Sequence, residues 1–347
     1  MKKRIIIESV VVFFLTIVFS STNVSADVYK DPILNRFSWN IDRITNDKMS
    51  LNKSTGKNVT IGIVDTGVDF NNILLKDNLL LDNRNDFVSE KNYLKDYSGH
   101  GTTVAGLIRQ IAPDSILVPY KITDEKNKNI STLNKSIIKA ANDGINIINI
   151  SIGAYKNITL KNDANEILGF EEAIKYATNM GSIVVGAVGN DAYNMDNLYY
   201  EKGIYDIPGN FDNLISVSGT NFNNQVSSFS NYGRRVTIAA PAGDKKDKFE
   251  LNDVIIGLFP SYLESPYVNI GIPNGYTITY GTSLSAAEVT GGLADIFSSF
   301  KEKYGRYPSL DEAKDILTAS KSTLTDKNSN KTKLLDIEAS LDYLSGL

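Results

Sequence analysis

The residues that could carry chemistry in this chain of 347 residues are an aspartate, the single histidine and a serine, in that order. Asp65 ends an apolar run, His100 lies in Gly99-His100-Gly101-Thr102 just before a predicted helix, and Ser283 opens a helical segment. A serine hydroxyl is a poor nucleophile until an imidazole takes its proton, and the imidazole needs a carboxylate that orients it and stabilises its cation. Asp65, His100 and Ser283 therefore predict catalysis by a nucleophilic serine.

The composition narrows the chemistry further. The chain has no cysteine, which excludes a thiol nucleophile and disulfide bonds, and one histidine without cysteine argues against a structural zinc site. With 36 basic and 40 acidic residues, and no basic cluster beyond the N-terminus, the chain lacks the positive surface that nucleic acid requires. An aspartic protease would need a second Asp-Thr-Gly or Asp-Ser-Gly motif besides Asp65-Thr66-Gly67, and the sequence has none. We expect a hydroxyl nucleophile and no cofactor.

The first 26 residues have the pattern of a secretory signal peptide. Lys2, Lys3 and Arg4 precede the apolar run Val10 to Phe19, and a polar stretch then ends at Ala26, the expected cleavage point. The apolar run is shorter than the roughly 20 residues of a membrane-spanning helix, although an uncleaved anchor is the competing interpretation. We therefore predict a secreted, extracellular and monomeric product with no stable membrane span after signal removal.

Apolar, β-branched runs alternate along the chain with segments whose apolar residues have helical spacing. This alternation is typical of buried parallel strands joined by helices, so we predict an α/β layered fold without internal repeats or an interdomain linker. Two segments rich in Asn, Asp, Gly and Tyr, 191–205 and 243–274, are predicted to be surface loops. The predicted strands are 59–64, 116–122, 145–152, 183–188, 214–217 and 236–240, and the predicted helices are 102–111, 132–142, 171–180, 309–317 and 335–344.

The predicted elements bring the candidate residues to one place. In open parallel sheets, functional groups gather at the carboxyl ends of the strands, and Asp65 and Asn190 both follow an apolar run. An acyl-transfer site also needs donors for the negative oxygen that develops on the substrate carbonyl. Asn190 can offer its side-chain amide beside the backbone N–H of Ser283, which we expect at a helix N-terminus.

These residues and their order resemble the subtilisin-like serine proteases, from about Trp39 to the end of the chain. Further similar segments are Asn149 to Gly153, Ser228 to Gly233 and Ala240 to Gly243. The resemblance implies a peptidase domain over 38–347, with a central, mostly parallel β-sheet and helices on both faces. It also implies that Asn190 binds the oxyanion and that Ser151, Ile152 and Gly153 pair with the substrate backbone as an added strand.

The chain departs from the family pattern at three places. Ala287 stands where the family usually has proline, and Thr103 stands where a second histidine is common. Alanine favours helix, so we expect the helix to continue and catalysis to survive. The helix after His100 runs directly into the next predicted strand, without the loop that wraps a calcium ion in many relatives. We therefore predict no metal at that position, while a cation site elsewhere in the loops stays open.

The resemblance also predicts substrate preference. Tyr205 to Gly209 aligns with the floor of the primary specificity pocket, which puts Asp206 where many relatives have glycine, and Asp191 aligns with the rim. Carboxylates there would favour arginine or lysine before the scissile bond, the P1 position. The alternative is that both are ordinary solvated aspartates of an acidic protein.

Three functions from different classes are compatible with the sequence. Only a short segment, 27–37, separates the predicted signal from the region that resembles a mature domain, and the chain lacks cysteine and is rich in Asn, Lys and Ile. These features resemble the lantibiotic leader peptidases of Gram-positive bacteria, which remove the leader from a modified peptide precursor. The second hypothesis is a secreted degradative subtilase of broad specificity. The third is a non-catalytic binding module, although such proteins usually lose a triad residue.

Overall fold

The computed structural model describes residues 28–88, 94–124, 129–245 and 250–347. The described residues form an eight-stranded sheet with the order β11-β12-β8-β7-β5-β3-β1-β2, in which all neighbours are parallel except β11 and β12. The α/β fold predicted from the alternating pattern is thus confirmed. The strands are β1 Thr60–Asp65, β2 Ile116–Lys121, β3 Ile147–Ile150, β5 Ile183–Ala187, β7 Ile215–Thr220, β8 Ile238–Pro241, β11 Thr323–Thr325 and β12 Lys331–Leu334.

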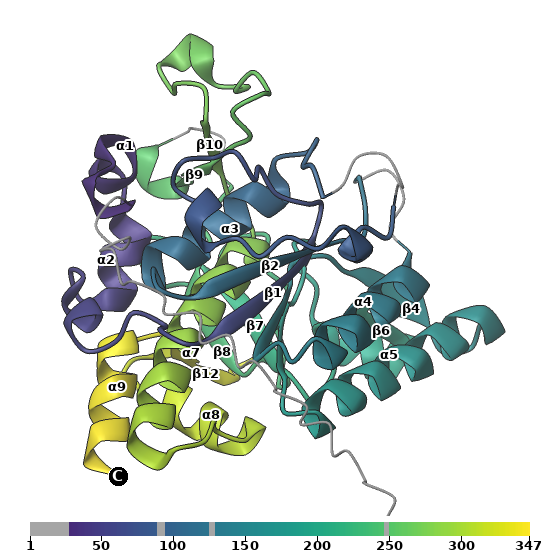
Figure 1. Ribbon diagram of the computed structural model, residues 1–347. Helices are drawn as coiled ribbons and strands as arrows, with labels where there is room; N and C mark the ends of the chain where they lie inside the picture. Colours follow the sequence, from purple (N-terminus) through teal and green to yellow (C-terminus); the bar gives the residue numbers. More distant parts are fainter. Residues whose placement is uncertain (1–27, 89–93, 125–128, 246–249) are drawn as a thin grey trace, which may run out of the picture.

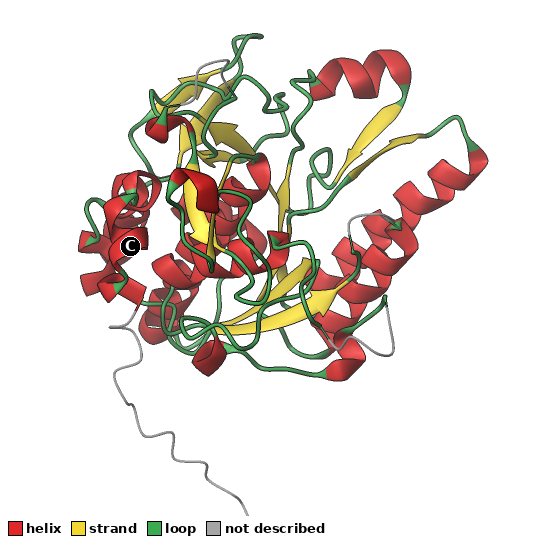
Figure 2. Ribbon diagram, turned by 90° about the horizontal axis from the view of Figure 1, so that it is seen from above, coloured by secondary structure: helices red, strands yellow, loops and turns green. Residues whose placement is uncertain are grey.

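Helices cover both faces of the sheet (Figures 1 and 2). On one face, α3 (His100–Ile111) and α7 (Thr282–Tyr304) form a core with Ile61 and Ile63 of β1. On the other face, α4 (Ile130–Asn142) and α5 (Lys161–Asn179) pack against Val64 of the same strand. Alternate residues of β1 therefore enter opposite cores, which explains why the sequence of this strand is apolar throughout instead of alternating with polar residues.

The remaining described elements lie around these layers. Two hairpins stand outside the main sheet, namely β4 with β6 and β9 with β10, and both are antiparallel. Short helices cover the N-terminal and C-terminal parts. The further helices are α1 Pro32–Arg36, α2 Trp39–Thr45, α6 Met195–Lys202, α8 Leu310–Leu317 and α9 Ile337–Gly346. The strands of the two hairpins are β4 Ala154–Asn157, β6 Ile204–Ile207, β9 Ile255–Leu258 and β10 Tyr276–Thr279.

Both segments predicted to be loops contain regular structure, so these two predictions were wrong. Within 191–205, Asn194 caps α6 by accepting from two backbone N–H groups, and Gly203 ends the helix in a left-handed conformation. The residues that suggested a loop are therefore caps of a short helix. Within 243–274, β9 is a short apolar strand whose Ile255 is buried in the same core as α3. The polar residues on both sides of this strand concealed it in the sequence.

The N-terminal helices α1 and α2, on either side of the predicted start of the peptidase domain, pack onto the body of the protein. Leu34 of α1 and Ile41 of α2 belong to the same core as α3 and α7, and the indole Nε1 of Trp39 donates to the carbonyl of Val254 at 2.8 Å. In the described part of the chain, no helix combines the length and hydropathy that crossing a membrane requires. The predicted signal peptide, 1–26, lies outside the described residues.

Candidate active site

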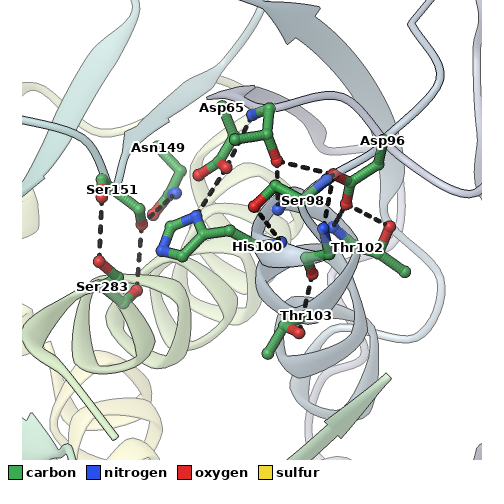
Figure 3. Close-up of polar contacts among 12 residues, drawn as sticks. Asp65, Asp96, Ser98, His100, Thr102, Thr103, Asn149, Ser151 and Ser283 are labelled. Carbon is green, nitrogen blue, oxygen red and sulfur yellow. Dashed lines mark hydrogen bonds and ion pairs between the residues drawn. The ribbon is translucent and has the colours of Figure 1, made fainter. Parts of the chain in front are cut away.

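The end of β1 holds the first member of the predicted triad. Asp65 is fully buried, and its Oδ1 accepts a hydrogen bond from the backbone N–H of Thr66 at 2.8 Å and lies 2.7 Å from Nδ1 of His100. This contact favours the imidazole tautomer with the proton on Nδ1, which leaves Nε2 as the acceptor on the other side of the ring. Figure 3 shows the His100 ring between Asp65 and Ser283.

A second buried carboxylate, Asp96, shapes the turn that leads into His100. It accepts hydrogen bonds from the Thr66 hydroxyl, from the backbone N–H groups of Ser98, Gly99 and Thr102, and from the Thr102 hydroxyl, all within 3.0 Å (Figure 3). Carboxylates that accept several hydrogen bonds are strong structural anchors. Asp96 therefore links the strand end next to Asp65 with the first turn of α3, a role that was not predicted from the sequence.

Gly101 allows the two segments to approach each other closely. Its backbone N–H donates to the Thr66 hydroxyl at 2.9 Å. A Cβ atom at this position would lie 2.1 Å from the carbonyl oxygen of Gly67, a distance that forces the backbone to move. The glycine after His100 is therefore required by the contact between α3 and the end of β1.

Ser283 is the second residue of α7, so its backbone N–H lies at a helix N-terminus, as predicted. Its hydroxyl donates to the carbonyl of Ser151 at 2.9 Å, and the Ser151 hydroxyl donates to the carbonyl of Ser283 at 3.0 Å (Figure 3). This reciprocal pair fixes the start of α7 against the end of β3. The helix then continues through the buried Ala287, which agrees with the expected effect of alanine at this position.

Asn190 is held so that its amide nitrogen remains the donor group of the side chain. Its Oδ1 accepts from the backbone N–H of Thr282 at 2.9 Å and from the Thr282 hydroxyl at 3.0 Å. Thr282, which is fully buried, also accepts from the backbone N–H of Gly189 at 3.2 Å. The Asn190 amide and the Ser283 N–H are therefore positioned by the same turn, in an arrangement suited to an oxyanion.

The candidate residues share one cleft, with a volume of about 640 Å³. Asp65 stands apart because it is buried behind His100. The sequence-predicted residues that line the cleft are His100, Ser151, Ile152, Gly153, Asn190, Asp191, Asp206 and Ser283. Segments from β3, β5 and β6 thus converge here with helices α3 and α7, and every site residue predicted from the sequence belongs to this assembly.

One end of the cleft is acidic. Asp206 of β6 is only 3% exposed, and its Oδ2 accepts from the side-chain amide of Asn231 at 3.0 Å. Burial raises the pKa of Asp206 well above its ordinary value, and the Asp191 carboxylate adds to the rise, whereas the Asn231 hydrogen bond opposes it. No lysine or arginine occurs among the described residues that line the cleft. Its carboxylates therefore have no basic partner among the described residues that line the cleft.

Tyr155 and Asn231 complete this acidic end, and neither was assigned a role from the sequence. The Asn231 amide also donates to the Tyr155 hydroxyl at 2.7 Å, and the Tyr155 hydroxyl donates to Asp191. Burial, and after it the Asp206 carboxylate, raises the pKa of Tyr155, so the phenol stays a neutral donor. Asn231 lies in the segment 228–233 that resembles the family, and this resemblance could have indicated a role for it. No feature of the sequence indicated a role for Tyr155.

The helix after His100 has the form expected from the sequence. It ends at Ile111, and β2 begins at Ile116, so residues 112–115 connect the two directly. Among the described residues, no three His, Asp or Glu side chains are grouped as metal ligands. That the protein works without a metal stays a prediction.

The sequence comparison decides the family. Residues 56–334 match the subtilase family, peptidase S8. The chain belongs to the subtilase family. Among its relatives is the epidermin leader peptide-processing serine protease EpiP of Staphylococcus epidermidis, 30% identical over 292 residues, which cover 74% of this chain and 63% of that protein. Another is the nisin leader peptide-processing serine protease NisP of Lactococcus lactis subsp. lactis, 30% identical over 313 residues, which cover 78% of this chain and 44% of that protein.

Solved structures agree with this assignment. The crystal structure of a lanthipeptide protease superposes with a TM-score of 0.84 at 26% identity, over 92% of this chain and 98% of the other. The crystal structure of NisP from Lactococcus lactis gives a TM-score of 0.73 at 26% identity, over 88% of this subtilase and 94% of that chain. The predicted subtilisin-like fold is thus confirmed.

Proposed function

We propose that this subtilase is a secreted serine endopeptidase that removes the leader peptide from a lantibiotic precursor by cleavage after a basic residue. The observation that carries the proposal is the acidic end of the cleft, where Asp206 and Asp191 lie beside His100 and Ser283. The names of the relatives EpiP and NisP, which process leader peptides, support the substrate class. The lanthipeptide protease with the same fold supports it too.

The geometry is suited to acyl transfer. In the proposed reaction the Ser283 hydroxyl turns from the Ser151 carbonyl to Nε2 of His100, which takes its proton as the oxygen attacks the substrate carbonyl carbon. Asp65 stabilises the imidazolium through Nδ1. The oxyanion accepts hydrogen bonds from the Ser283 backbone N–H and the Asn190 amide. His100 then donates the proton to the leaving amine, which departs, and water hydrolyses the acyl-enzyme.

The substrate backbone has a place beside the strand end at Ser151 to Gly153. These residues follow β3 and line the cleft, and none of them takes part in a strand pairing in the described part of the chain. Gly153 lies so close to the hairpin β4–β6 that a Cβ atom would be 2.2 Å from the carbonyl of Ile207. An extended peptide that adds to this edge gains affinity through main-chain hydrogen bonds without requiring a particular sequence.

The side chain before the scissile bond would then enter the acidic end. A guanidinium or ammonium there pairs with the buried Asp206 and reverses the effect of desolvation on its pKa. An uncharged side chain would leave a carboxylate buried without a counter-charge, which costs binding energy. A basic P1 residue is therefore favoured. A secreted location and a monomeric state belong to the same proposal.

The test is cleavage of peptides that span a leader junction and carry arginine, lysine or the uncharged arginine analogue citrulline at P1. We expect cleavage after arginine and lysine, abolished in Ser283→Ala, and a preference over citrulline that falls by at least tenfold in Asp206→Gly. An unchanged preference in Asp206→Gly would contradict the assigned pocket. Cleavage at many unrelated residues would indicate the degradative subtilase, and no cleavage by the unaltered chain would favour the binding module.

A further inference from the structure

Strand β3 carries one polar side chain, Asn149, which is fully buried, while the other three residues of the strand are isoleucines. We propose that Asn149 is a positioning residue, which holds the nucleophile Ser283 in place through the hydroxyl of Ser151. This inference rests on the proposed peptidase function. It adds to that function a residue that does not touch the substrate.

The place of Asn149 in the strand would suit an apolar side chain. Side chains alternate along a strand, and Ile147, which shares a face with Asn149, belongs to the core that contains α3 and α7. A buried amide is costly in such a core unless its hydrogen bonds are made. A leucine would fill the same space without that requirement, so packing alone does not explain the amide.

The amide joins two side chains in a directed series of hydrogen bonds. Its Oδ1 accepts from the Thr290 hydroxyl at 2.9 Å, and its Nδ2 donates to the Ser151 hydroxyl oxygen at 2.9 Å. The Ser151 hydroxyl donates in turn to the carbonyl of Ser283 at 3.0 Å (Figure 3). A hydroxyl has one proton, and because Ser151 accepts from Asn149, that proton is directed to Ser283.

Both ends of the series lie on helix α7. Thr290 follows Ser283 by about two helical turns. The series therefore leaves the helix at Thr290, crosses to β3 and returns to the helix at the nucleophile. Thr290 and Asn149 are both fully buried, so water cannot replace the bond between them. A shift of the start of α7 relative to β3 would break at least one bond of the series.

Ser283 is thereby held on both sides. On its N-terminal side, the backbone N–H of Thr282 is bonded to Asn190, and on its C-terminal side the Ser283 carbonyl is bonded to Ser151. With both neighbouring peptide groups held, the direction of the Cα–Cβ bond of Ser283 is fixed. The hydroxyl can then turn from the Ser151 carbonyl toward His100 without movement of the backbone.

The same bonds connect the nucleophile to the edge that is proposed to hold the substrate. Ser151 is the first residue of the edge 151–153 and lines the cleft, whereas Asn149 and Thr290 do not line it. Asn149 therefore acts through Ser151, and it sets the position of Ser283 relative to the bound peptide. A misplacement of about 1 Å can cost about 10²-fold in rate, so this spacing matters for catalysis.

The first experiment is a double-mutant cycle on a peptide with arginine at P1. Ser151→Ala and Asn149→Leu should each lower kcat by about fivefold, because each removes a hydrogen bond of the series, and KM should change by less than twofold. In the double variant, kcat should equal that of Ser151→Ala, since Asn149 acts only through the missing hydroxyl. Losses that multiply in the double variant, or an unaltered kcat in Asn149→Leu, would overturn the inference.

Two further variants separate positioning from stability. The triple variant Asn149→Leu, Ser151→Ala and Thr290→Val removes the three polar side-chain groups together, so none is left buried without its partner. In a Ser283→Ala background its urea midpoint should equal that of the background, while with Ser283 present its kcat should equal that of Ser151→Ala. A lower midpoint with unaltered kcat would assign a structural role only. Ser136→Ala is the matched control, because this buried serine of α4 donates to the Leu133 carbonyl at 2.7 Å and does not line the cleft. It should keep the kcat of the unaltered chain.

The failure of this inference is distinguishable from failure of the proposed function. The same variants are treated with a fluorophosphonate, which bonds the serine oxygen to phosphorus, releases fluoride and requires no leader peptide. Labelling that is slowed equally in Ser151→Ala and Asn149→Leu supports the positioning role even if no peptide is cleaved. Equal labelling rates in all variants overturn it even if cleavage after arginine is confirmed. An unaltered chain that is not labelled overturns both, because neither is compatible with an unreactive Ser283.

Discussion

Replacing Thr282 with valine tests whether the orientation of the Asn190 amide limits catalysis. Thr282 holds the Asn190 carbonyl oxygen with two hydrogen bonds, one from its backbone and one from its hydroxyl. Valine has nearly the same shape and removes only the hydroxyl. The backbone bond remains, so the amide is loosened and not released.

The Thr282 hydroxyl bonds both to Asn190 and to the Gly189 N–H, and the expected effect on kcat follows from the lost bond to Asn190. A neutral hydrogen bond contributes about 1 kcal/mol, with a range of about 0.5–1.5 kcal/mol. If that energy favours the productive orientation of the amide, kcat falls by about 5-fold, within a range of about 2- to 12-fold, because each 1.36 kcal/mol changes a rate tenfold. Asn190→Ala, which removes the donor altogether, should lower kcat by about 10²- to 10³-fold, a range measured on a subtilisin.

The assay is steady-state hydrolysis of one peptide with arginine at P1, with kcat and KM determined separately. The loss should be in kcat, because the oxyanion forms only after the substrate is bound. Thr45→Val is the matched control, since this buried threonine also loses hydrogen bonds of its hydroxyl, to Ile41 and Lys48, but lies far from the site in the N-terminal helix α2. It should lower stability and leave kcat unchanged.

Two results would refute the reasoning. One is a Thr282→Val enzyme with the kcat of the Thr45→Val control, because the hydroxyl would then contribute nothing to the oxyanion site. The other is a loss confined to KM, because the interaction would then act on the bound substrate and not on the transition state. Thermal unfolding of each variant, measured in a Ser283→Ala background to prevent self-digestion, separates catalytic from structural effects.

Further predictions concern the buried carboxylates and the glycine after His100. The pKa of Asp206 is raised in the folded state, so its contribution to the free energy of unfolding is lost as the pH rises through that pKa. Asparagine at this position carries no charge at any pH. Asp206→Asn in a Ser283→Ala background should therefore raise the unfolding temperature at pH 8 and change it little at pH 4. Calorimetry at the two pH values checks this, and equal shifts would contradict it. Asp96→Asn should destabilise the protein by about 2 kcal/mol or more in urea unfolding, because both Oδ1 and Oδ2 of Asp96 accept hydrogen bonds and the amide nitrogen that replaces one of them cannot accept. An unchanged midpoint would count against the anchoring role of Asp96. Gly101→Ala should lower kcat by more than tenfold, since its Cβ would meet the Gly67 carbonyl and displace His100 from Asp65. A Gly101→Ala enzyme with unaltered kcat would show that this contact can relax at no cost.

The amino-acid sequence alone was enough to predict the candidate reacting groups and much of the framework that holds them. Asp65 is predictable because an apolar strand ends there, and the carboxyl ends of parallel strands form one edge. With a single histidine in the chain, His100 had no competitor. Ser283 and Asn190 were identified from the short sequence segments that contain them and from their order along the chain.

Predictions from local patterns were wrong where a few polar residues have structural roles that the sequence does not reveal. Helix α6 was predicted as a loop because Asn194 and Gly203, which cap its two ends, are also common in turns. Strand β9 was missed because its pairing partner, β10, lies beyond a long connection. A short apolar run becomes a strand only through such a partner.

The tertiary structure alone decided what surrounds the catalytic residues. Tyr155 reaches Asn231 across 76 positions of the chain, and Ser261 reaches Asp69 across 192, so no local window contains either contact. The raised pKa of Asp206 likewise depends on which distant segments pack together. The sequence determined which groups can react because a residue's chemistry belongs to the residue itself, whereas burial, partners and cavity shape arise only when separate segments exclude water from one another.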